Sequence, residues 1–286
     1  MKNCECLIEG AIDSVLDQDF PHNSVELIFV DDGSEDNTLF IIESYTQRID
    51  MKTSVFHHKW RGLGATRNVV VKNAKGKYII WVDCDMRLSR EFIRKQVEFM
   101  DERPDVGIGK GEYGITDKTS IVAYLENIEA TVELLNSKRE SLSKPLGTGG
   151  SIYRVEAIRK VGGFDESITG VGEDMEVEHK IREAGWVLQT TPAVFFEMRR
   201  ENWQALWKEY FWHGSGGTTA YNKVDPHSML YRMFPPTAIL REFSRSLSAY
   251  RMVHRKIVFL LPLHWIFKRT AWFLGFLTSL MRAHAK

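Results

Sequence analysis

The stretches VELIFVDDGS at residues 25–34 and YIIWVDCD at residues 78–85 decide the fold of this 286-residue chain. Each is a short apolar run of strand-forming residues that ends in acidic side chains. Segments in which apolar residues recur at helical spacing lie around them, at residues 9–16, 38–49, 64–74 and 91–101. Strands that alternate with helices in this way predict an α/β fold with a mostly parallel sheet.

The acidic residues at the ends of these two strands should share one edge of the sheet. Asp31 and Asp32 end the first run, and Asp83 and Asp85 end the second. In such sheets ligands bind outside the carboxyl ends of the strands. Mg²⁺ or Mn²⁺ is commonly held there by one or two carboxylates and by the phosphates of a substrate. The alternative from spacing alone is that these acids cap helices or form turns.

Two glycine-rich segments further along are also candidates for chemistry. Gly172 precedes Glu173 and Asp174 at the start of a predicted helix over residues 173–184. A carboxylate there can act as general base on a hydroxyl, or it can simply cap the helix. Residues 212–217, WHGSGG, predict a loop whose amides approach phosphate and whose His213 ligates a metal. A lone histidine is, however, more often structural.

Two familiar ligand sites are excluded by their spacing. A calcium loop that begins at Asp31 needs glutamate at its twelfth position, where Ile42 stands. The segment RGLGATRN at residues 61–68 resembles a dinucleotide-binding fingerprint, but it lacks the third glycine and no apolar strand runs directly into it.

Composition restricts the class of protein and its surroundings. With 43% hydrophobic and 27% charged residues the chain is globular, and the balance of 38 basic and 38 acidic residues gives no indication of nucleic-acid binding. Cys4, Cys6 and Cys84 are too few for a disulfide framework, and the first two are too close together to bridge easily. We therefore expect reduced cysteines, no signal peptide and a cytoplasmic protein.

The balanced total conceals a basic end. No acidic residue follows Glu242, whereas eight Lys and Arg residues do. Two apolar runs, residues 257–267 and 270–281, are separated by Lys268 and Arg269, and charges at this position disfavour a single membrane-spanning helix. The pattern favours two helices that lie on an anionic membrane surface. The alternative is a helical pair packed on the catalytic domain or in a homo-oligomer.

Five motifs in this order resemble the family-2 glycosyltransferases of the GT-A fold, over approximately residues 3–193. They are VDDGS at 30–34, GLGATRN at 62–68, VDCD at 82–85, VGGFDE at 161–166, and GED at 172–174 followed by GW at 185–186. The resemblance implies an inverting transfer of a sugar from a UDP- or GDP-sugar to a hydroxyl acceptor, with Mn²⁺ or Mg²⁺ as cofactor.

The resemblance also implies a role for each residue that matches a family motif. Asp31, with Asp32 beside it, contacts the nucleotide base, and Arg67 lies near the base or a phosphate. Asp83 lies near the ribose and the metal, and Asp85 ligates the metal. Asp174 is the general base, with Glu173 beside it.

From this we expect a catalytic domain over residues 1–200, with its nucleotide-sugar half at about 1–115 and its acceptor half at about 116–200, and a helical region over 201–286. Family members normally begin with an apolar strand, and here that first strand is apparently missing. We expect a lipid-linked or envelope glycan acceptor and peripheral attachment at the cytoplasmic face of a membrane.

Two alternative functions remain. One is a polyprenyl-phosphate sugar synthase of the same fold, whose relatives usually carry Gln after the Asp-x-Asp, where this chain has Met86. The other is a non-catalytic protein that binds nucleotide sugars or acts as a scaffold.

Overall fold

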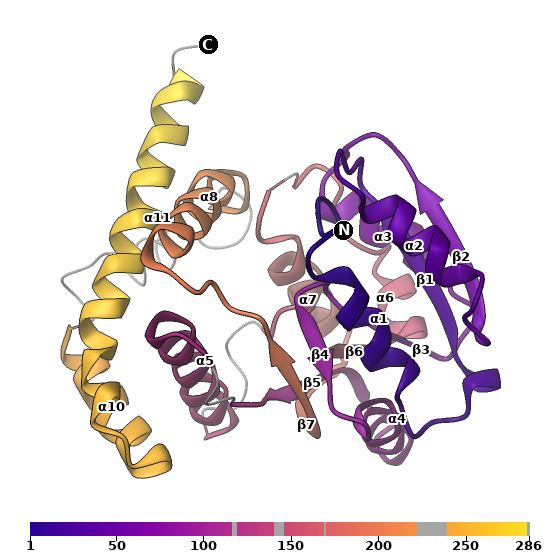
Figure 1. Ribbon diagram of the computed structural model, residues 1–286, viewed down its shortest axis with the longest axis horizontal. Helices are drawn as coiled ribbons and strands as arrows, with labels where there is room; N and C mark the ends of the chain where they lie inside the picture. Colours follow the sequence, from indigo (N-terminus) through magenta and orange to yellow (C-terminus); the bar gives the residue numbers. More distant parts are fainter. Residues whose placement is uncertain (116–118, 140–145, 169, 222–238, 285–286) are drawn as a thin grey trace. The chain divides into compact units, whose positions relative to one another are not determined.

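The computed structural model describes residues 1–115, 119–139, 146–168, 170–221 and 239–284. They form two compact units (Figure 1). The first unit contains Met1–Tyr113, Ser141–Thr169 and Glu173–Met198. The second contains Gly114–Glu140, Gly170–Gly172 and Arg199–Lys286.

The first unit contains two sheets. Strands β1 (Glu26–Asp31) and β2 (Lys52–His57) form a parallel pair. The second sheet has the order β3-β6-β5-β7-β4, with bounds Tyr78–Ile80, Ser151–Arg154, Val106–Tyr113, Val187–Glu197 and Met86–Leu88. In it only β5 and β7 pair in parallel, and the other neighbours are antiparallel. The predicted α/β class is confirmed, but this larger sheet is mixed and not mostly parallel.

Strand β7 differs from what the sequence pattern predicts, because the aromatic pattern beyond Pro192 favours a helix, whereas the strand continues through Pro192 to Glu197. The ladder between β5 and β7 is irregular between Lys110 and Glu112, opposite the part of β7 that contains Pro192. Proline has no N–H to donate and is tolerated in strands where the ladder is interrupted. The exposed Pro192 therefore fits within this strand.

Helices cover both faces of the larger sheet. The helices of the first unit are α1 (Ile8–Leu16), α2 (Thr38–Thr46), α3 (Leu63–Asn73), α4 (Phe92–Glu102), α6 (Val155–Lys160) and α7 (Glu173–Glu183), with a short η1 at His22–Ser24. Ile152 packs against Met100 of α4, whereas the next residue, Tyr153, packs in the cluster that holds Val177 and Ile181 of α7. Alternate side chains of a strand thus bury opposite faces.

Helices α1, α2 and α3 lie around the β1–β2 pair (Figure 1). Within the described residues no strand precedes β1. The backbone of Met1 contacts this strand, since its nitrogen donates to Val30 O at 2.8 Å and its carbonyl accepts from Asp32 N–H at 2.8 Å.

The second unit is helical in its described residues. It contains α5 (Ile121–Arg139), α8 (Trp203–Tyr221), α10 (Ile239–Val253), η3 (Lys256–Leu260) and α11 (Leu261–His284). The interruption expected at Lys268 and Arg269 is wrong, because α11 continues through both residues. One stretch of the described chain, Lys256–Met281, is long and apolar enough to cross a membrane by length and composition. Core helices of soluble proteins can pass the same test.

The loop expected at residues 212–217 is also wrong, because α8 continues through this segment. Its glycines allow close helix packing instead. A Cβ on Gly214 would meet Trp272 O of α11 at 1.9 Å, and a Cβ on Gly275 of α11 would meet Phe211 O of α8 at 2.1 Å. The two helices therefore approach backbone to backbone, which only residues without a side chain permit.

Candidate active site

Asp31 lies fully buried at the end of β1, opposite His57 at the end of β2. Its Oδ2 accepts the Ser34 N–H at 3.1 Å and lies 2.8 Å from His57 Nδ1, and its Oδ1 accepts the Ser34 hydroxyl. Although burial raises the pKa of Asp31, the bonds from Ser34 and His57 outweigh it and lower the pKa below its usual range. The carboxylate thus fixes the turn after β1 while the half-exposed His57 faces solvent.

Asp32 fixes the start of α3. It accepts the Arg61 N–H at 2.7 Å and the Gly62 N–H at 3.1 Å, and it lies 3.3 Å from His58 Nδ1. These amides belong to the segment that leads into the helix, where backbone donors lack intrahelical partners. The Asp32 carboxylate satisfies them and so positions the helix that carries Arg67.

The Asp83-Cys84-Asp85 segment forms a turn between β3 and β4. Asp83 is exposed and Asp85 is half-buried. A Cβ on Gly149, in the loop before β6, would stand only 2.7 Å from Asp83 Oδ2. The absence of a side chain at Gly149 therefore leaves the room that the Asp83 carboxylate occupies.

This donor set fits a divalent cation such as Mn²⁺ or Mg²⁺. Asp83 and Asp85 offer carboxylate oxygens one residue apart, which hard cations prefer as ligands. Asp83 keeps its exposed carboxylate beside the space at Gly149, where a methyl group would collide with it. Of the residues named from sequence, these two form the candidate metal centre of the first unit.

Arg67 of α3 connects the segment at residues 61–68 to the start of α7. Its guanidinium donates to Glu173, and both side chains are largely buried. Burial lowers the pKa of Arg67, but attraction to Glu173, Asp83 and Asp174 outweighs burial and raises the pKa above its usual value. Glu173, Asp83 and Asp174 thus lie within electrostatic reach of the Arg67 guanidinium, although the four residues come from distant parts of the chain.

Asp174 occupies the second residue of α7 and is half-buried. Its Oδ1 accepts the Met175 N–H at 2.8 Å. Its Oδ2 lies 3.6 Å from the position that a Cβ on Gly147 would take, and the Lys110 ammonium lies 4.0 Å from the same position. The acid therefore faces the glycine-rich segment 146–151, beside a buried cation.

Glu178, one turn further along α7, holds this glycine-rich segment in place. It is buried and accepts the N–H of Leu146 at 2.8 Å and of Gly147 at 2.7 Å. Burial, with repulsion from Asp174, raises the pKa of Glu178 to about 7. Lys110 donates to the carbonyl of Gly149 from the other side.

His213 lies on α8 of the second unit, half-buried beside the rings of Tyr210 and Trp212. It was predicted as a metal ligand on a loop, and the structure places it on a helix. The carboxylates of Asp83 and Asp85 belong to the first unit.

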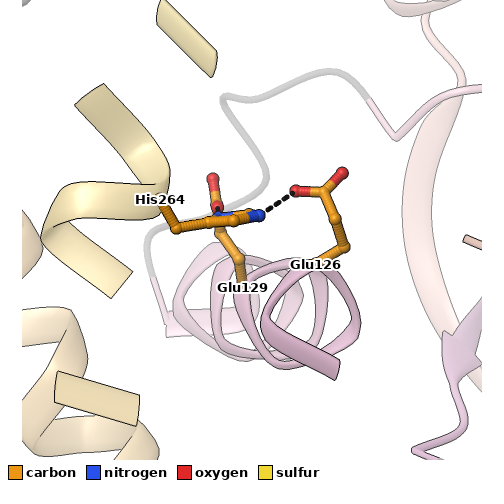
Figure 2. Close-up of side chains that lie close together, drawn as sticks. All are labelled: Glu126, Glu129 and His264. Atoms are coloured by element: carbon orange, nitrogen blue, oxygen red, sulfur yellow. Dashed lines mark ion pairs between the residues drawn. The ribbon is translucent and has the colours of Figure 1, made fainter. Parts of the chain in front are cut away.

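A second group of metal-ligand residues lies in the second unit. Figure 2 shows His264 of α11 pointing toward Glu126 and Glu129 of α5, with each ring nitrogen 3.4 Å from one carboxylate. The Lys268 ammonium lies 2.5 Å from Glu126 and 2.6 Å from Glu129. The single Lys268 ammonium thus already forms ion pairs with both carboxylates and balances one of their two charges. We interpret the group as a buried ion-pair cluster that joins α11 to α5.

His57, Lys110 and Glu178 were not among the site residues predicted from the sequence. His57 could have been found, because residues 54–57 (SVFH) have a strand-like pattern and the carboxyl ends of parallel strands share one edge of a sheet. Lys110 and Glu178 were hidden, because one sits inside a glycine-rich strand and the other in a helix rich in charged residues. Their importance arises from contacts with a loop more than 30 residues away.

Comparison with known proteins identifies related sequences. Residues 1–162 match the family model "Glycosyl transferase family 2". Poly(ribitol-phosphate) beta-N-acetylglucosaminyltransferase TarS of Staphylococcus aureus is 33% identical over 137 residues, 48% of this chain and 24% of that protein. A poly-beta-1,6-N-acetyl-D-glucosamine synthase of Staphylococcus epidermidis is 25% identical over 242 residues, 83% of this chain and 55% of that protein. The chain therefore spans only part of the length of these relatives.

Solved structures show the same fold. Mannosyltransferase PcManGT from Pyrobaculum calidifontis, in complex with GDP-Man and Mn²⁺, superposes with a TM-score of 0.66 at 18% identity, over 96% of this chain and 84% of that one. S. aureus TarS 1–349 with UDP-GlcNAc superposes with a TM-score of 0.55 at 18% identity, over 100% of this chain and 90% of that one. At this identity the likeness establishes the fold.

Proposed function

Because the chain belongs to glycosyltransferase family 2, we propose that its first unit transfers a sugar from a nucleoside-diphosphate sugar to a hydroxyl group, with inversion at the sugar carbon. The observation that carries this proposal is the buried ion pair between Arg67 and Glu173, which come from two motifs of the family. Asp83 and Asp174, from the Asp-x-Asp motif and the start of α7, lie within electrostatic reach of Arg67. Residues 1–115 hold the donor in this proposal, and residues within 116–200 hold the acceptor.

Asp174 is the general base of the proposed reaction. Its carboxylate takes the proton of the acceptor hydroxyl while the acceptor oxygen bonds to C1 of the sugar and the bond from C1 to the diphosphate breaks. Asp174 suits this role because it is half-buried at the start of α7 and faces a segment with little side-chain bulk. The buried Glu173 and Glu178 hold Arg67 and the glycine-rich segment on either side of it.

Asp83 and Asp85 are the proposed ligands of Mn²⁺ or Mg²⁺, and the prediction that His213 ligates a metal stays a prediction. When bound, such a cation neutralises charge that develops on the departing nucleoside diphosphate. Arg67 contributes a second positive charge near the nucleotide. Asp31 and Asp32 fix the loops that contact the nucleotide base in this proposal.

Donor screening tests the proposal at its first step. The solved structures of similar fold hold GDP-Man with Mn²⁺ and UDP-GlcNAc, which makes GDP- and UDP-sugars the first donors to examine. We expect one nucleotide class to raise the melting temperature in the presence of Mn²⁺ and to lose this effect with EDTA. Release of nucleoside diphosphate from the stabilising donor then separates an enzyme from a non-catalytic binder, in which the donor binds and remains intact.

We further propose that the second unit attaches the protein to the cytoplasmic face of a membrane, close to a lipid-linked or envelope glycan acceptor. Apolar side chains that are 40–65% exposed lie on η3 and α11, among them Leu260, Leu263 and Met281. Arg251 and Lys256 are exposed nearby in the chain. Exposed apolar side chains with flanking cations favour peripheral binding to anionic lipid.

The ion-pair cluster supports peripheral attachment by α11. Lys268 is one of the two charges, with Arg269, that should oppose burial of this helix in lipid. The carboxylates of Glu126 and Glu129 pair with Lys268 inside the second unit. The Lys268 side chain is 3% exposed, so it adds no charge to the outer surface of α11.

Vesicle flotation tests this attachment. We expect the full chain to float with vesicles that contain phosphatidylglycerol, and the Arg251→Glu/Lys256→Glu variant to float less. The Lys72→Glu/Lys75→Glu variant makes the same change of charge at exposed sites of the first unit and serves as control. If the protein does not bind anionic vesicles but is a dimer by light scattering, the exposed apolar surface of the second unit binds a second copy of the chain and not a membrane.

A polyprenyl-phosphate sugar synthase is the alternative acceptor assignment within this fold. Supplying polyprenyl phosphate as acceptor tests it directly, because a glycosylated lipid phosphate would then appear as product.

A further inference from the structure

Cys4 and Cys84 form a disulfide in the first unit, with their Cα atoms 6.2 Å apart. The expectation that the cysteines stay reduced therefore does not hold for this pair, because the fold brings together residues separated by 80 positions. Cys6 is exposed and has no such partner. Cys4 is buried in the core cluster of α1 and α2, and Cys84 packs against that cluster.

The disulfide joins the Asp83-Cys84-Asp85 turn to the N-terminal segment that contacts the loop after β1. Cys84 is the central residue of the Asp83-Cys84-Asp85 turn, so its side chain restrains both candidate metal ligands. Cys4 belongs to the segment that holds the loop after β1. Its N–H donates to Thr38 Oγ1 at 2.7 Å, and the neighbouring Asn3 N–H donates to Ser34 Oγ at 2.9 Å.

Hydrogen bonds also hold the turn. The Asp83 carbonyl accepts the Met86 N–H at 3.0 Å, and the Asp85 carbonyl accepts the Met198 N–H at 2.7 Å, which attaches the turn to the larger sheet. Arg87 donates to the Cys84 carbonyl at 3.4 Å and to the Leu7 carbonyl at 3.1 Å. The disulfide is the covalent link from this turn to the segment that holds the Asp31 loop, which belongs to the β1–β2 side of the unit.

We propose that Cys4 and Cys84 form a reversible redox bond that controls how firmly the Asp83-Cys84-Asp85 turn is held against the Asp31 loop. A small-molecule disulfide such as oxidised glutathione is the oxidant. The two thiols lose two protons and two electrons to form the S–S bond, and the oxidant is reduced to two thiols. An excess of dithiol reverses the exchange.

The bond prepares the turn for metal and nucleotide, and this consequence rests on the proposed function. In the reduced protein, binding must restrict a turn that the disulfide otherwise restricts in advance. Since preorganisation lowers the entropic cost of binding, the oxidised form should bind UDP or GDP with Mn²⁺ about three- to tenfold more tightly.

Full-length protein is treated with oxidised glutathione or with dithiothreitol and digested without reduction, and peptide masses then report the bond. In the oxidised protein we expect the peptides of Cys4 and Cys84 to be linked, and the melting temperature to be about 4–16 °C higher than in the reduced protein. Isothermal titration with UDP or GDP and Mn²⁺ follows for both forms.

Cys4→Ser and Cys84→Ser should each remove the response to oxidant, and Cys6→Ser should keep it. Cys4→Ser lies outside the metal turn and carries the test if Cys84→Ser folds poorly. Unlinked peptides, or equal nucleotide affinities in the linked and unlinked forms, would overturn the proposal. If neither form binds nucleotide, the proposed function fails and redox control of binding falls with it, while the peptide masses and melting temperatures still establish whether the bond itself forms.

Discussion

Arg67 of α3 and Glu173 of α7 form a buried ion pair across 106 positions of sequence. The pair joins the motif at residues 62–68 to α7, the helix that carries the proposed general base. The two residues have different roles in the proposed reaction, since Arg67 contacts the donor and Glu173 holds Arg67 in place. Stability and donor binding should therefore separate when the pair is changed.

Arg67→Met leaves the Glu173 carboxylate buried without its cation, which should lower the free energy of unfolding by about 3–5 kcal/mol. The double variant Arg67→Met/Glu173→Leu removes both charges and should recover most of this loss. Urea denaturation measures the stability of each variant. Nucleotide affinity should stay low in both variants, and recovery of affinity in the double variant would contradict a role of Arg67 in donor binding.

Glu178 should make the protein less stable as pH rises. Its pKa is about 7 in the folded state against a reference of 4.5, so the folded protein binds the proton more tightly than the unfolded chain does. The stabilisation is therefore fully present below pH 4.5 and is lost as pH rises through 7. This group alone should lower the free energy of unfolding by about 3 kcal/mol over that interval.

Glu178→Gln should remove this part of the pH dependence while its amide oxygen still accepts the N–H groups of Leu146 and Gly147. Urea denaturation at pH 5 and pH 8 compares the variant with wild type. Glu183→Gln changes an exposed residue of the same helix and is the matched control. An unchanged pH dependence in Glu178→Gln would show that Glu178 is ionised throughout.

Gly149→Ala should displace Asp83, because the added methyl group would lie 2.7 Å from Oδ2. We expect the affinity for nucleotide with Mn²⁺ to fall about tenfold, equivalent to about 1.4 kcal/mol. Gly162→Ala is the control, since its left-handed backbone strains an alanine but no atom lies within 4 Å of the added carbon. That control should lose stability and keep its affinity for nucleotide.

The two groups of potential metal ligands should respond oppositely to loss of a carboxylate charge. Asp85→Asn should weaken Mn²⁺-dependent nucleotide binding by about tenfold or more and leave the melting temperature nearly unchanged. Glu129→Gln weakens the ion pair with Lys268 and should lower the free energy of unfolding by about 3 kcal/mol without changing metal affinity. Isothermal titration with Mn²⁺ shows which group binds the metal. Loss of metal binding in Glu129→Gln would assign the metal site to the second unit.

Sequence patterns predicted the parts of the fold that depend on local order. The apolar runs at residues 25–30 and 78–82 and the helices between them follow from periodicity, and acids at strand ends point to one edge of a sheet. Strand β7 was missed because Pro192 and aromatic residues favoured a different pattern, and its place depends on an irregular ladder with β5.

Pairings across long separations could not be predicted from the sequence. The bond between Cys4 and Cys84 spans 80 positions, and Lys268 meets Glu126 across 142. The role of Gly214 and Gly275 is likewise visible only once α8 packs against α11, because each glycine allows the backbone of the other helix to approach closely. Such contacts arise from tertiary packing, which local patterns do not encode.

Asp174 is the general base of the proposed reaction, and the rate of donor turnover by Asp174→Asn tests this role. With the stabilising donor and Mn²⁺, we expect the rate of nucleoside diphosphate release to fall about 10²- to 10⁴-fold while the dissociation constant of the donor stays within about twofold of wild type. Glu176→Gln, in the same first turn of α7, should keep its activity. Turnover of the donor by Asp174→Asn at the wild-type rate would contradict the role of Asp174 as general base.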